Sequence, residues 1–218
     1  MNVYVVTEGI AEQKVYVEWI PLINDRLVQV TDLDQVVQDT FYLVSGNGYP
    51  SYFEMISNAI EDVNRYTAFS RLVVSVDSED MTREEKLAEV EEFVSDKGCR
   101  VEVVIVVQHF CFEAWALGNR KIVRPNTQSV RLKRFRQIHD VRTRDPELLP
   151  PLDEDELTRA QFAAKYLRAA LNDKHRNLTY TKKDPAALKN PKYLEQLRLR
   201  LQETGHIRSF EDFLNAFA

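Results

Sequence analysis

Acidic side chains follow three stretches of the sequence that have the character of buried strands, and their positions suit the binding of a divalent metal ion. These residues are Glu8, Asp77 and Glu113. In open α/β sheets the carboxyl ends of the strands meet at one edge, where ligands gather. Mg²⁺ and Mn²⁺ prefer oxygen ligands such as carboxylates. The sequence therefore predicts an Mg²⁺ or Mn²⁺ site at this edge of a sheet.

The first carboxylate lies in the segment 7–12, TEGIAE. Gly9 permits a tight turn from strand to helix, which would place Glu8 at the sheet edge. Glu12, four residues further on, would point the same way from the first helical turn. Glu12 is therefore a further candidate ligand, and stabilisation of the helix N-terminus is its alternative role.

Three carboxylates, Asp77, Glu79 and Asp80, arrive within four positions after the strand expected at Arg71–Val76. Asp77 and Glu79 share one side if the chain stays extended, because strand side chains alternate. Asp80 competes with Glu79 for the role of ligand, and helix capping before Thr82 is its alternative. Capping explains Asp77 poorly, so Asp77 is expected to bind metal.

Glu113 lies between Phe112 and Trp115, in apolar surroundings. Burying a charge without a partner is costly, so either a metal ion or an arginine is expected beside it. His109 is the histidine best placed to join these carboxylates. With oxygen ligands around it, we expect a structural or substrate-contacting role for His109.

The elements that must position these residues follow from the hydrophobic pattern. Short apolar stretches predict buried strands at Val3–Thr7, Gln38–Ser45, Arg71–Val76 and Val101–Val107. Helical spacing and capping patterns predict helices at Ala11–Ile23, Ser51–Tyr66, Arg83–Lys97 and Phe112–Leu117. This alternation predicts an α/β fold, a mostly parallel sheet flanked by helices on both faces.

The pattern changes beyond residue 120, where no strand is expected. The stretch Pro146–Pro151 predicts a linker. Helices are expected at Asp155–Leu171, at Pro191–Gln202 and from Ser209 onward. We therefore expect an α/β core over residues 1–120 and, over residues 121–218, a basic segment and a helical extension packed on that core.

Charge is divided unevenly along the chain, although the net charge is only −5. Residues 1–98 contain 19 acidic and 7 basic residues, whereas residues 99–218 contain 15 acidic and 22 basic residues. A localised basic stretch, from Arg120 to Arg144, is a candidate contact for a phosphate backbone. The residues expected to make that contact are Arg120, Lys121, Arg131, Lys133, Arg134 and Arg136. A solvated surface is the alternative interpretation.

Composition argues against a membrane or secreted protein. The longest apolar run, Val101–Val107, is far shorter than the about 20 residues that a membrane helix needs. The first ten residues lack the basic start and long apolar stretch of a signal peptide. Cys99 and Cys111 form neither a metal-binding spacing nor a disulfide framework. A soluble, cytoplasmic protein is expected. The sequence does not fix its oligomeric state, and a homo-oligomer is one of the possibilities.

The carboxylate motifs, taken in order along the chain, resemble those of the Toprim (topoisomerase–primase) domain. That family has a Glu-Gly pair after the first strand, matched here by Glu8 and Gly9, and an Asp-x-Asp after a later strand. Asp77-Ser78-Glu79 matches the second motif with Glu in place of the second Asp. The resemblance implies a Toprim-like, Rossmann-like sheet over residues 1–120.

A narrower resemblance is to the OLD (overcoming-lysogenization-defect) nucleases and to small RloB-like Toprim proteins linked to phage defence. It rests on the segment 7–12 (TEGIAE), on Gly46 after the second strand and on the segment 112–115 (FEAW). A downstream lysine completes the set in the OLD nucleases. Lys182 is the best match for that lysine, and Lys183 is the alternative.

These motifs together predict a metal-dependent endonuclease, and the resemblance implies a role in bacterial anti-phage defence. The metal ligands would come from Glu8, Glu12, Asp77, Glu79, Asp80 and Glu113. Lys182 would stabilise the charge that develops on the phosphate. DNA and RNA substrates are not distinguished by the sequence.

The sequence motifs also bear on two alternative functions and on one possible partner protein. The departure at Glu79 favours a non-catalytic nucleic-acid-binding or regulatory subunit of a defence complex. A small-molecule phosphohydrolase is disfavoured, because Asp77–Met81 does not fit the pattern Asp-x-Asp-x-Thr. No P-loop pattern occurs, so an ATPase, where one is required, would be a separate partner.

Overall fold

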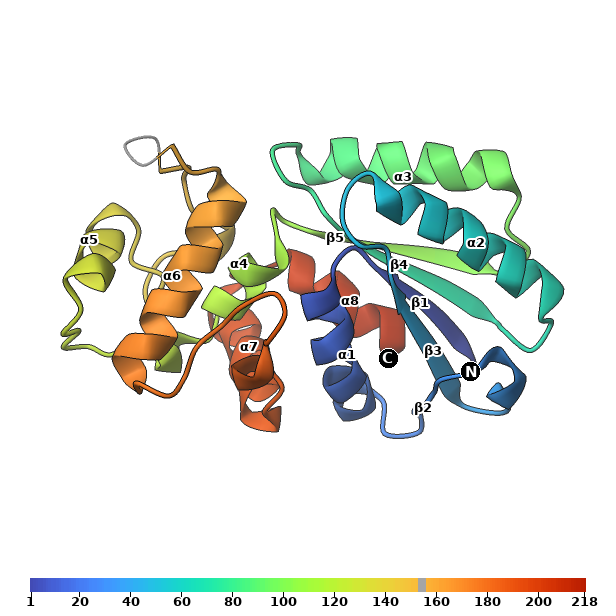
Figure 1. Cartoon of the computed structure of the whole chain (residues 1–218), viewed down its shortest axis with the longest axis horizontal. Helices are drawn as coiled ribbons and strands as arrows, with labels where there is room; N and C mark the ends of the chain where they lie inside the picture. The colour runs from blue at the N-terminus through green and yellow to red at the C-terminus, as the bar shows by residue number, and fades with distance from the viewer. Residues whose placement is uncertain (153–155) are drawn as a thin grey trace.

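The computed structural model, which describes residues 1–152 and 156–218, contains a five-stranded sheet whose paired strands are all parallel (Figure 1). The strands are β1 (Val3–Thr7), β2 (Val28–Val30), β3 (Thr40–Ser45), β4 (Arg71–Asp77) and β5 (Glu102–Gln108). They lie in the order β2-β3-β1-β4-β5. The predicted α/β fold with a Rossmann-like sheet is confirmed, and the four longer strands match the four predicted ones to within two residues at each end.

Helices cover both faces of this sheet. The helices on one face are α1 (Ile10–Ile23) and α8 (Ser209–Phe217), and those on the other face are α2 (Ser51–Arg65) and α3 (Arg83–Lys97). Successive residues of β1 serve the two faces, because Val3 packs in the core under α1 whereas Tyr4 packs in the core under α2. Burial on both sides explains why the strands are almost continuously apolar.

The direction in which the chain winds reverses at β1. From β1 the chain passes through α1 to β2 and β3 on one side, and then through α2 to β4 and β5 on the other side. The loops that leave β1 and β4 therefore lead to opposite faces. A switch point of this kind, at the carboxyl ends of parallel strands, is where ligands bind in open α/β sheets.

Local sequence signals set the ends of α3. The Thr82 hydroxyl accepts a hydrogen bond from the Glu85 amide, and the Glu85 carboxylate accepts one from the Thr82 amide, which completes a capping box. Gly98 ends the helix with φ 68°, a left-handed conformation that glycine adopts without strain. The helix predicted at Arg83–Lys97 is confirmed at both of its ends.

The second half of the chain is helical and shares a core with the sheet. Its helices are α4 (Phe112–Leu117), α5 (Val130–Ile138), α6 (Arg159–Lys174) and α7 (Pro191–Thr204), followed by α8. Trp115, Phe162 and Leu197 belong to the same buried cluster as Val5 and Val73 of the sheet. No helix in the described ranges has both the length and the apolar character needed to cross a membrane.

Four details differ from the sequence-based expectation. The short strand β2 and the helix α5 were not predicted. The stretch Pro146–Pro151, expected to be a linker, is instead packed, because Pro146 and Leu149 are buried and Glu147 accepts a 3.1 Å hydrogen bond from the Ser209 amide. α6 begins at Arg159, and the predicted start at Asp155 lies outside the described residues.

Candidate metal centre

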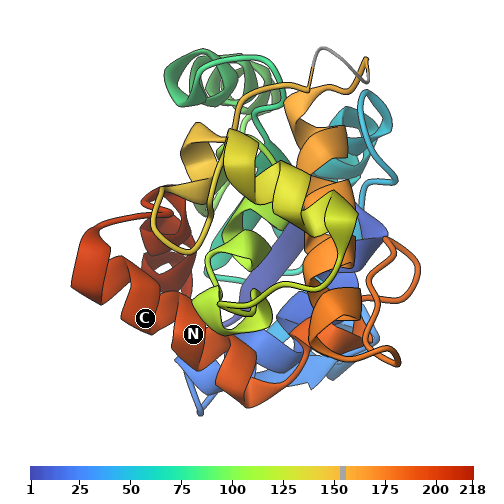
Figure 2. The same cartoon turned by 90° about the vertical axis from the view of Figure 1, so that its left-hand side faces the viewer.

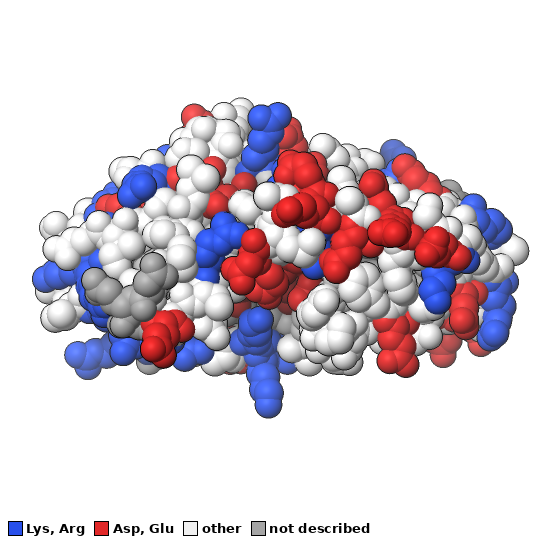
Figure 3. Space-filling view, turned by 90° about the horizontal axis from the view of Figure 1, so that it is seen from above, with Lys and Arg blue, Asp and Glu red and all other residues white. Residues whose placement is uncertain are grey.

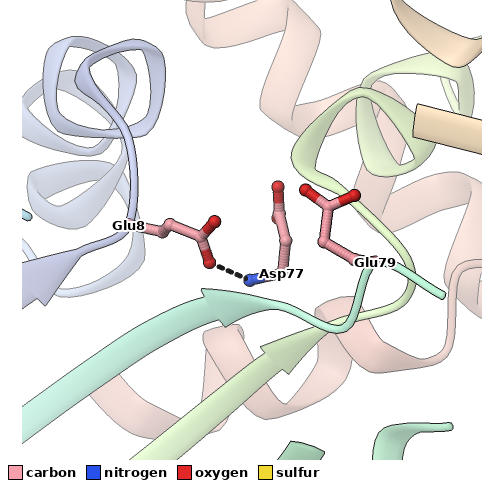
Figure 4. Close-up of side chains that lie close together, drawn as sticks. All are labelled: Glu8, Asp77 and Glu79. Carbon is pink, nitrogen blue, oxygen red and sulfur yellow. Dashed lines mark hydrogen bonds between the residues drawn. The ribbon is translucent and has the colours of Figure 1, made fainter. Parts of the chain in front are cut away.

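Three carboxylates meet at the carboxyl ends of β1 and β4. Single oxygen atoms of Glu8, Asp77 and Glu79 all lie within 4.8 Å of one another. Figure 4 shows the three side chains converging on one space, with Glu8 entering from the end of β1. The Asp77 amide donates a 3.0 Å hydrogen bond to Glu8 Oε2, which fixes one carboxylate oxygen of Glu8 and leaves the other to face its neighbours. This spacing suits a single divalent cation shared by three oxygen ligands.

The start of α1 brings Glu12 beside the first three carboxylates. Gly9 has an extended backbone (φ −123°), so its role differs from the tight turn expected from the sequence. A Cβ atom at position 9 would lie 2.7 Å from Glu12 Oε2. A larger residue at position 9 would therefore force the Glu12 carboxylate, which is buried, to move.

The loop after β4 holds Asp77 and Glu79 against the loop after β5. Asp77 Oδ1 accepts a 3.1 Å hydrogen bond from the Phe112 amide, and the Glu79 amide donates a 2.9 Å hydrogen bond to the Phe110 carbonyl. Glu79 adopts φ 51°, which turns its side chain toward Asp77. Asp80 is exposed and lies outside this set of three carboxylates. The N-cap of α3 is Thr82, so Asp80 does not cap that helix.

Glu113 adds a fifth carboxylate, and its hydrogen-bond partner is a tyrosine. The Tyr180 hydroxyl donates a 2.8 Å hydrogen bond to Glu113 Oε1, and both side chains are buried. The arginine considered as a partner for Glu113 is not found among the described ion pairs. The five carboxylates Glu8, Glu12, Asp77, Glu79 and Glu113 are called the carboxylate cluster below.

Burial and like charge raise the pKa values of Glu8, Glu12, Asp77 and Glu79. Burial is the main cause of the raised pKa values of Glu8, Asp77 and Glu79. Burial, followed by the charge of Glu113, raises the pKa of Glu12 to about 7. A divalent cation would remove this penalty, because it favours the ionised carboxylates. The possible ligands are carboxylate oxygens, which Mg²⁺ and Mn²⁺ prefer. Either cation would also reduce the repulsion between these carboxylates.

Lys182 faces the carboxylate cluster from the segment between α6 and α7. The charge of Glu113, ahead of those of Asp77 and Glu12, raises the pKa of the Lys182 ammonium. No ion pair within 4.0 Å joins Lys182 to a carboxylate in the described ranges, so its ammonium is available to a ligand. Lys183 contributes its backbone instead, since Lys14 Nζ donates a 2.6 Å hydrogen bond to the Lys183 carbonyl.

Two further cations approach the cluster and were not selected from the sequence. Lys86 of α3 is buried and donates a 2.6 Å hydrogen bond to Glu89 Oε2. Its charge offsets part of the rise that burial causes in the pKa of Glu8. Arg159 Nη2 donates a 2.8 Å hydrogen bond to the Glu79 carbonyl. The burial of Lys86 could have been predicted from the sequence, because it lies four residues before Val90 and therefore on the same face of α3.

His109 lies at the rim of the site. Its Nδ1 atom is 3.0 Å from the Ser78 hydroxyl, and burial lowers the pKa of its imidazole. His109 is not among the residues whose possible metal-ligand atoms lie within 4.8 Å of one another, which are Glu8, Asp77 and Glu79. The structural or substrate-contacting role expected for this histidine stays a prediction.

The basic residues predicted to contact nucleic acid fall into two groups. Arg120 pairs with Glu203, and Arg136 pairs with Asp140 at 2.8 Å, so a carboxylate of this chain already neutralises the charge of each of these arginines. Lys121, Arg131 and Lys133 are exposed, while Arg134 of α5 is partly buried.

Comparisons with known proteins do not assign the chain to a family. No protein-family model matches it, and no match was found among curated proteins or solved structures. The resemblance to Toprim domains therefore stays a prediction, and the case for function rests on the geometry of the site.

Proposed function

We propose that this protein is an Mg²⁺- or Mn²⁺-dependent nuclease that hydrolyses phosphodiester bonds. The observation that carries the proposal is the convergence of five carboxylates at the switch point of the sheet, opposite Lys182, which has no ion-pair partner within 4.0 Å in the described ranges. A structural role alone would favour fewer buried like charges, because each costs stability.

Glu8, Asp77 and Glu79 are the residues that would hold a first ion. Glu12 and Glu113 lie close enough for their charges to act on Asp77, and they would contribute to a second ion or position the attacking water. Bound metal would supply charge stabilisation at the attacking and leaving oxygens. Lys182 binds and neutralises the phosphate that is attacked, because its ammonium faces the same carboxylates.

The biological setting of the proposal comes from the resemblance. It favours a cytoplasmic enzyme of bacterial anti-phage defence, with any ATPase supplied by a separate chain. The non-catalytic alternative, a nucleic-acid-binding or regulatory subunit, predicts normal binding of nucleic acid without metal-dependent turnover.

Incubation with nucleic acids tests the proposal directly. Plasmid DNA, single-stranded DNA and tRNA are incubated with the chain in Mg²⁺, Mn²⁺ or EDTA. Cleavage is expected with metal, and Asp77→Asn should reduce it at least about a thousandfold, because Asp77 is a ligand at the centre of the cluster.

The matched control is Asp80→Asn, which removes the same charge from an exposed position three residues away. This variant should keep at least half of the activity. Binding of Mn²⁺, followed by electron paramagnetic resonance, should weaken in Asp77→Asn and not in Asp80→Asn. Wild-type levels of cleavage by a folded Asp77→Asn variant would refute the proposal, and binding without cleavage of any substrate would support the non-catalytic alternative.

A further inference from the structure

A large basic groove lies on the second half of the chain, away from the carboxylate cluster. It encloses a cavity of ≈ 910 Å³ beside α5 and α6, and Figure 2 shows these two helices crossing. Its basic lining residues are Arg124, Arg131, Lys165, Arg168, Lys174 and Arg176. The only carboxylate among its lining residues is Asp173. We call this surface the basic groove.

The carboxylate in the groove is already occupied by the backbone. Asp173 Oδ1 accepts hydrogen bonds from the Gln128 amide (2.9 Å) and the Ser129 amide (2.7 Å), and so it fixes the loop that leads into α5. No ion pair within 4.0 Å involves Arg131, Lys165 or Arg176 in the part of the chain that the structure describes. These cations are exposed, so their charge is available to a ligand.

A single short segment connects the groove to the carboxylate cluster. Arg168, which lines the groove, donates a 3.0 Å hydrogen bond from Nε to the Tyr180 carbonyl, and the Tyr180 hydroxyl in turn bonds Glu113. Lys182 follows Arg176, another lining residue, by six positions. Six residues span at most about 21 Å when fully extended. That distance equals about six base steps of a duplex backbone.

The opposite half of the molecule carries the opposite charge. Acidic side chains gather over α3, as Figure 3 shows from above, and α3 contains Glu84, Glu91 and Glu92 on its surface. A polyanion is repelled from this face and attracted to the groove. Charge complementarity therefore favours a ligand with many phosphates, approaching from the side of α5 and α6.

We propose that the basic groove binds the sugar–phosphate backbone of the nucleic acid whose phosphodiester bond reaches the carboxylate cluster. The proposal rests on the proposed function for the cleavage step, but the groove would bind nucleic acid without metal. Contacts to phosphates carry no sequence information, so binding depends on length and charge and not on base sequence.

The test compares two double charge reversals. Lys165→Glu with Arg176→Glu alters the groove, and Arg26→Glu with Arg65→Glu makes the same change at exposed positions of the other half. Arg168 is left unchanged because it supports Tyr180. Binding of a labelled oligonucleotide of about 20 nucleotides is measured by fluorescence anisotropy in EDTA, over a series of salt concentrations.

The groove variant should bind at least about tenfold more weakly, and the plot of log K against log[salt] should become shallower by about 1.4 for a single strand, the effect of two lost phosphate contacts. The control variant should bind like wild type. Equal losses in both variants would overturn the proposal. Displacement of the oligonucleotide by millimolar inorganic phosphate or AMP would also overturn it, because the groove would then be a small-anion site.

Cleavage assays distinguish a failure of the groove proposal from a failure of the nuclease proposal. If wild type cleaves and the groove variant both binds and cleaves normally, the groove has no such role, although the nuclease stands. If the groove variant loses binding while wild type cleaves nothing, the groove stands and the nuclease fails. A folded Asp77→Asn variant should bind in EDTA with wild-type affinity, since it leaves the groove intact.

Discussion

The carboxylate cluster and the basic groove each bring together charges of one sign, but only the first is largely buried. Glu8, Glu12, Asp77 and Glu113 are all buried, whereas Lys165 and Arg176 of the groove are exposed. Water screens like charges at the surface at little cost. The buried carboxylates repel one another in a poorly screened environment, so the fold tolerates them only at a cost that a bound cation would offset.

The difference is sharpest in the response to pH without metal. Burial raises the pKa of Glu12 from an ordinary value of 4.5 to about 7, and the pKa values of Glu8, Asp77 and Glu79 are also raised. The folded state then binds more protons than the unfolded state, so stability falls as pH rises from about 4.5 to above 7.

Denaturation at pH 5 and pH 8, with and without Mg²⁺, measures this effect. Saturating Mg²⁺ should abolish most of the loss, because the cation favours the ionised carboxylates. Burial also raises the pKa of Glu147 to about 7, and Glu147 is not one of the close carboxylates, so Glu147→Gln serves to subtract its contribution to the pH dependence. The same pH dependence with and without Mg²⁺ would contradict a metal centre.

Replacement of Lys182 is expected to have the next largest effect. Lys182→Ala should lower kcat about a hundredfold, because the ammonium that faces the carboxylates is lost. Lys183→Ala is the matched control and should change kcat less than about twofold, since position 183 contributes a carbonyl to Lys14. Steady-state cleavage rates decide the matter, and similar losses in both variants would remove Lys182 from the mechanism.

A smaller effect is expected at Tyr180. Tyr180→Phe removes the hydrogen bond to Glu113, which should cost about 1 kcal/mol of stability and lower cleavage about tenfold. Tyr193→Phe is a matched control, because its buried hydroxyl donates a 2.8 Å hydrogen bond to the Ala116 carbonyl. It should lose similar stability in urea denaturation while keeping its activity. Equal activity in the two variants would show that Tyr180 only supports the fold.

The smallest effect tests whether the two charged regions act independently. Reversal of Lys165 and Arg176 should change the Mn²⁺ dissociation constant less than about twofold at physiological ionic strength, because exposed charges are screened within about 8 Å. Mn²⁺ titration followed by electron paramagnetic resonance provides the measurement. A tenfold change would mean that the groove and the cluster form one electrostatic unit.

The sheet could be predicted because its strands are buried on both faces, which makes them almost continuously apolar. β2 escaped prediction because it is only three residues long and Val28 and Gln29 are exposed. α5 was overlooked because five of its nine residues are polar or charged, and only Leu132 and Phe135 among its residues are buried. A short pattern of this kind carries little periodic signal.

Glu8, Asp77 and Glu113 could be located from the sequence because each follows a predicted strand. The residues that lie beside them in the folded protein could not be predicted. The choice between Glu79 and Asp80 depends on the positive φ of Glu79, which no local rule predicts for a glutamate. Tyr180, which bonds Glu113, lies 67 residues away from it in the sequence. The charge of Lys86 affects the pKa of Glu8 from α3, although Glu8 follows β1. Such contacts are set by tertiary packing. The metal, the nuclease activity and the family resemblance stay predictions.

The wide separation of the parts that complete the site has a consequence for synthesis on the ribosome. The Ser209 hydroxyl accepts a hydrogen bond from the His109 amide across 100 positions, and α8 covers part of the sheet face next to α1. A nascent chain therefore exposes its carboxylates long before Lys182 and α8 emerge. A partly translated polypeptide would hold the acidic half of the site without the lysine or the closing helix, so the proposed nuclease site would be complete only after the later segments have emerged.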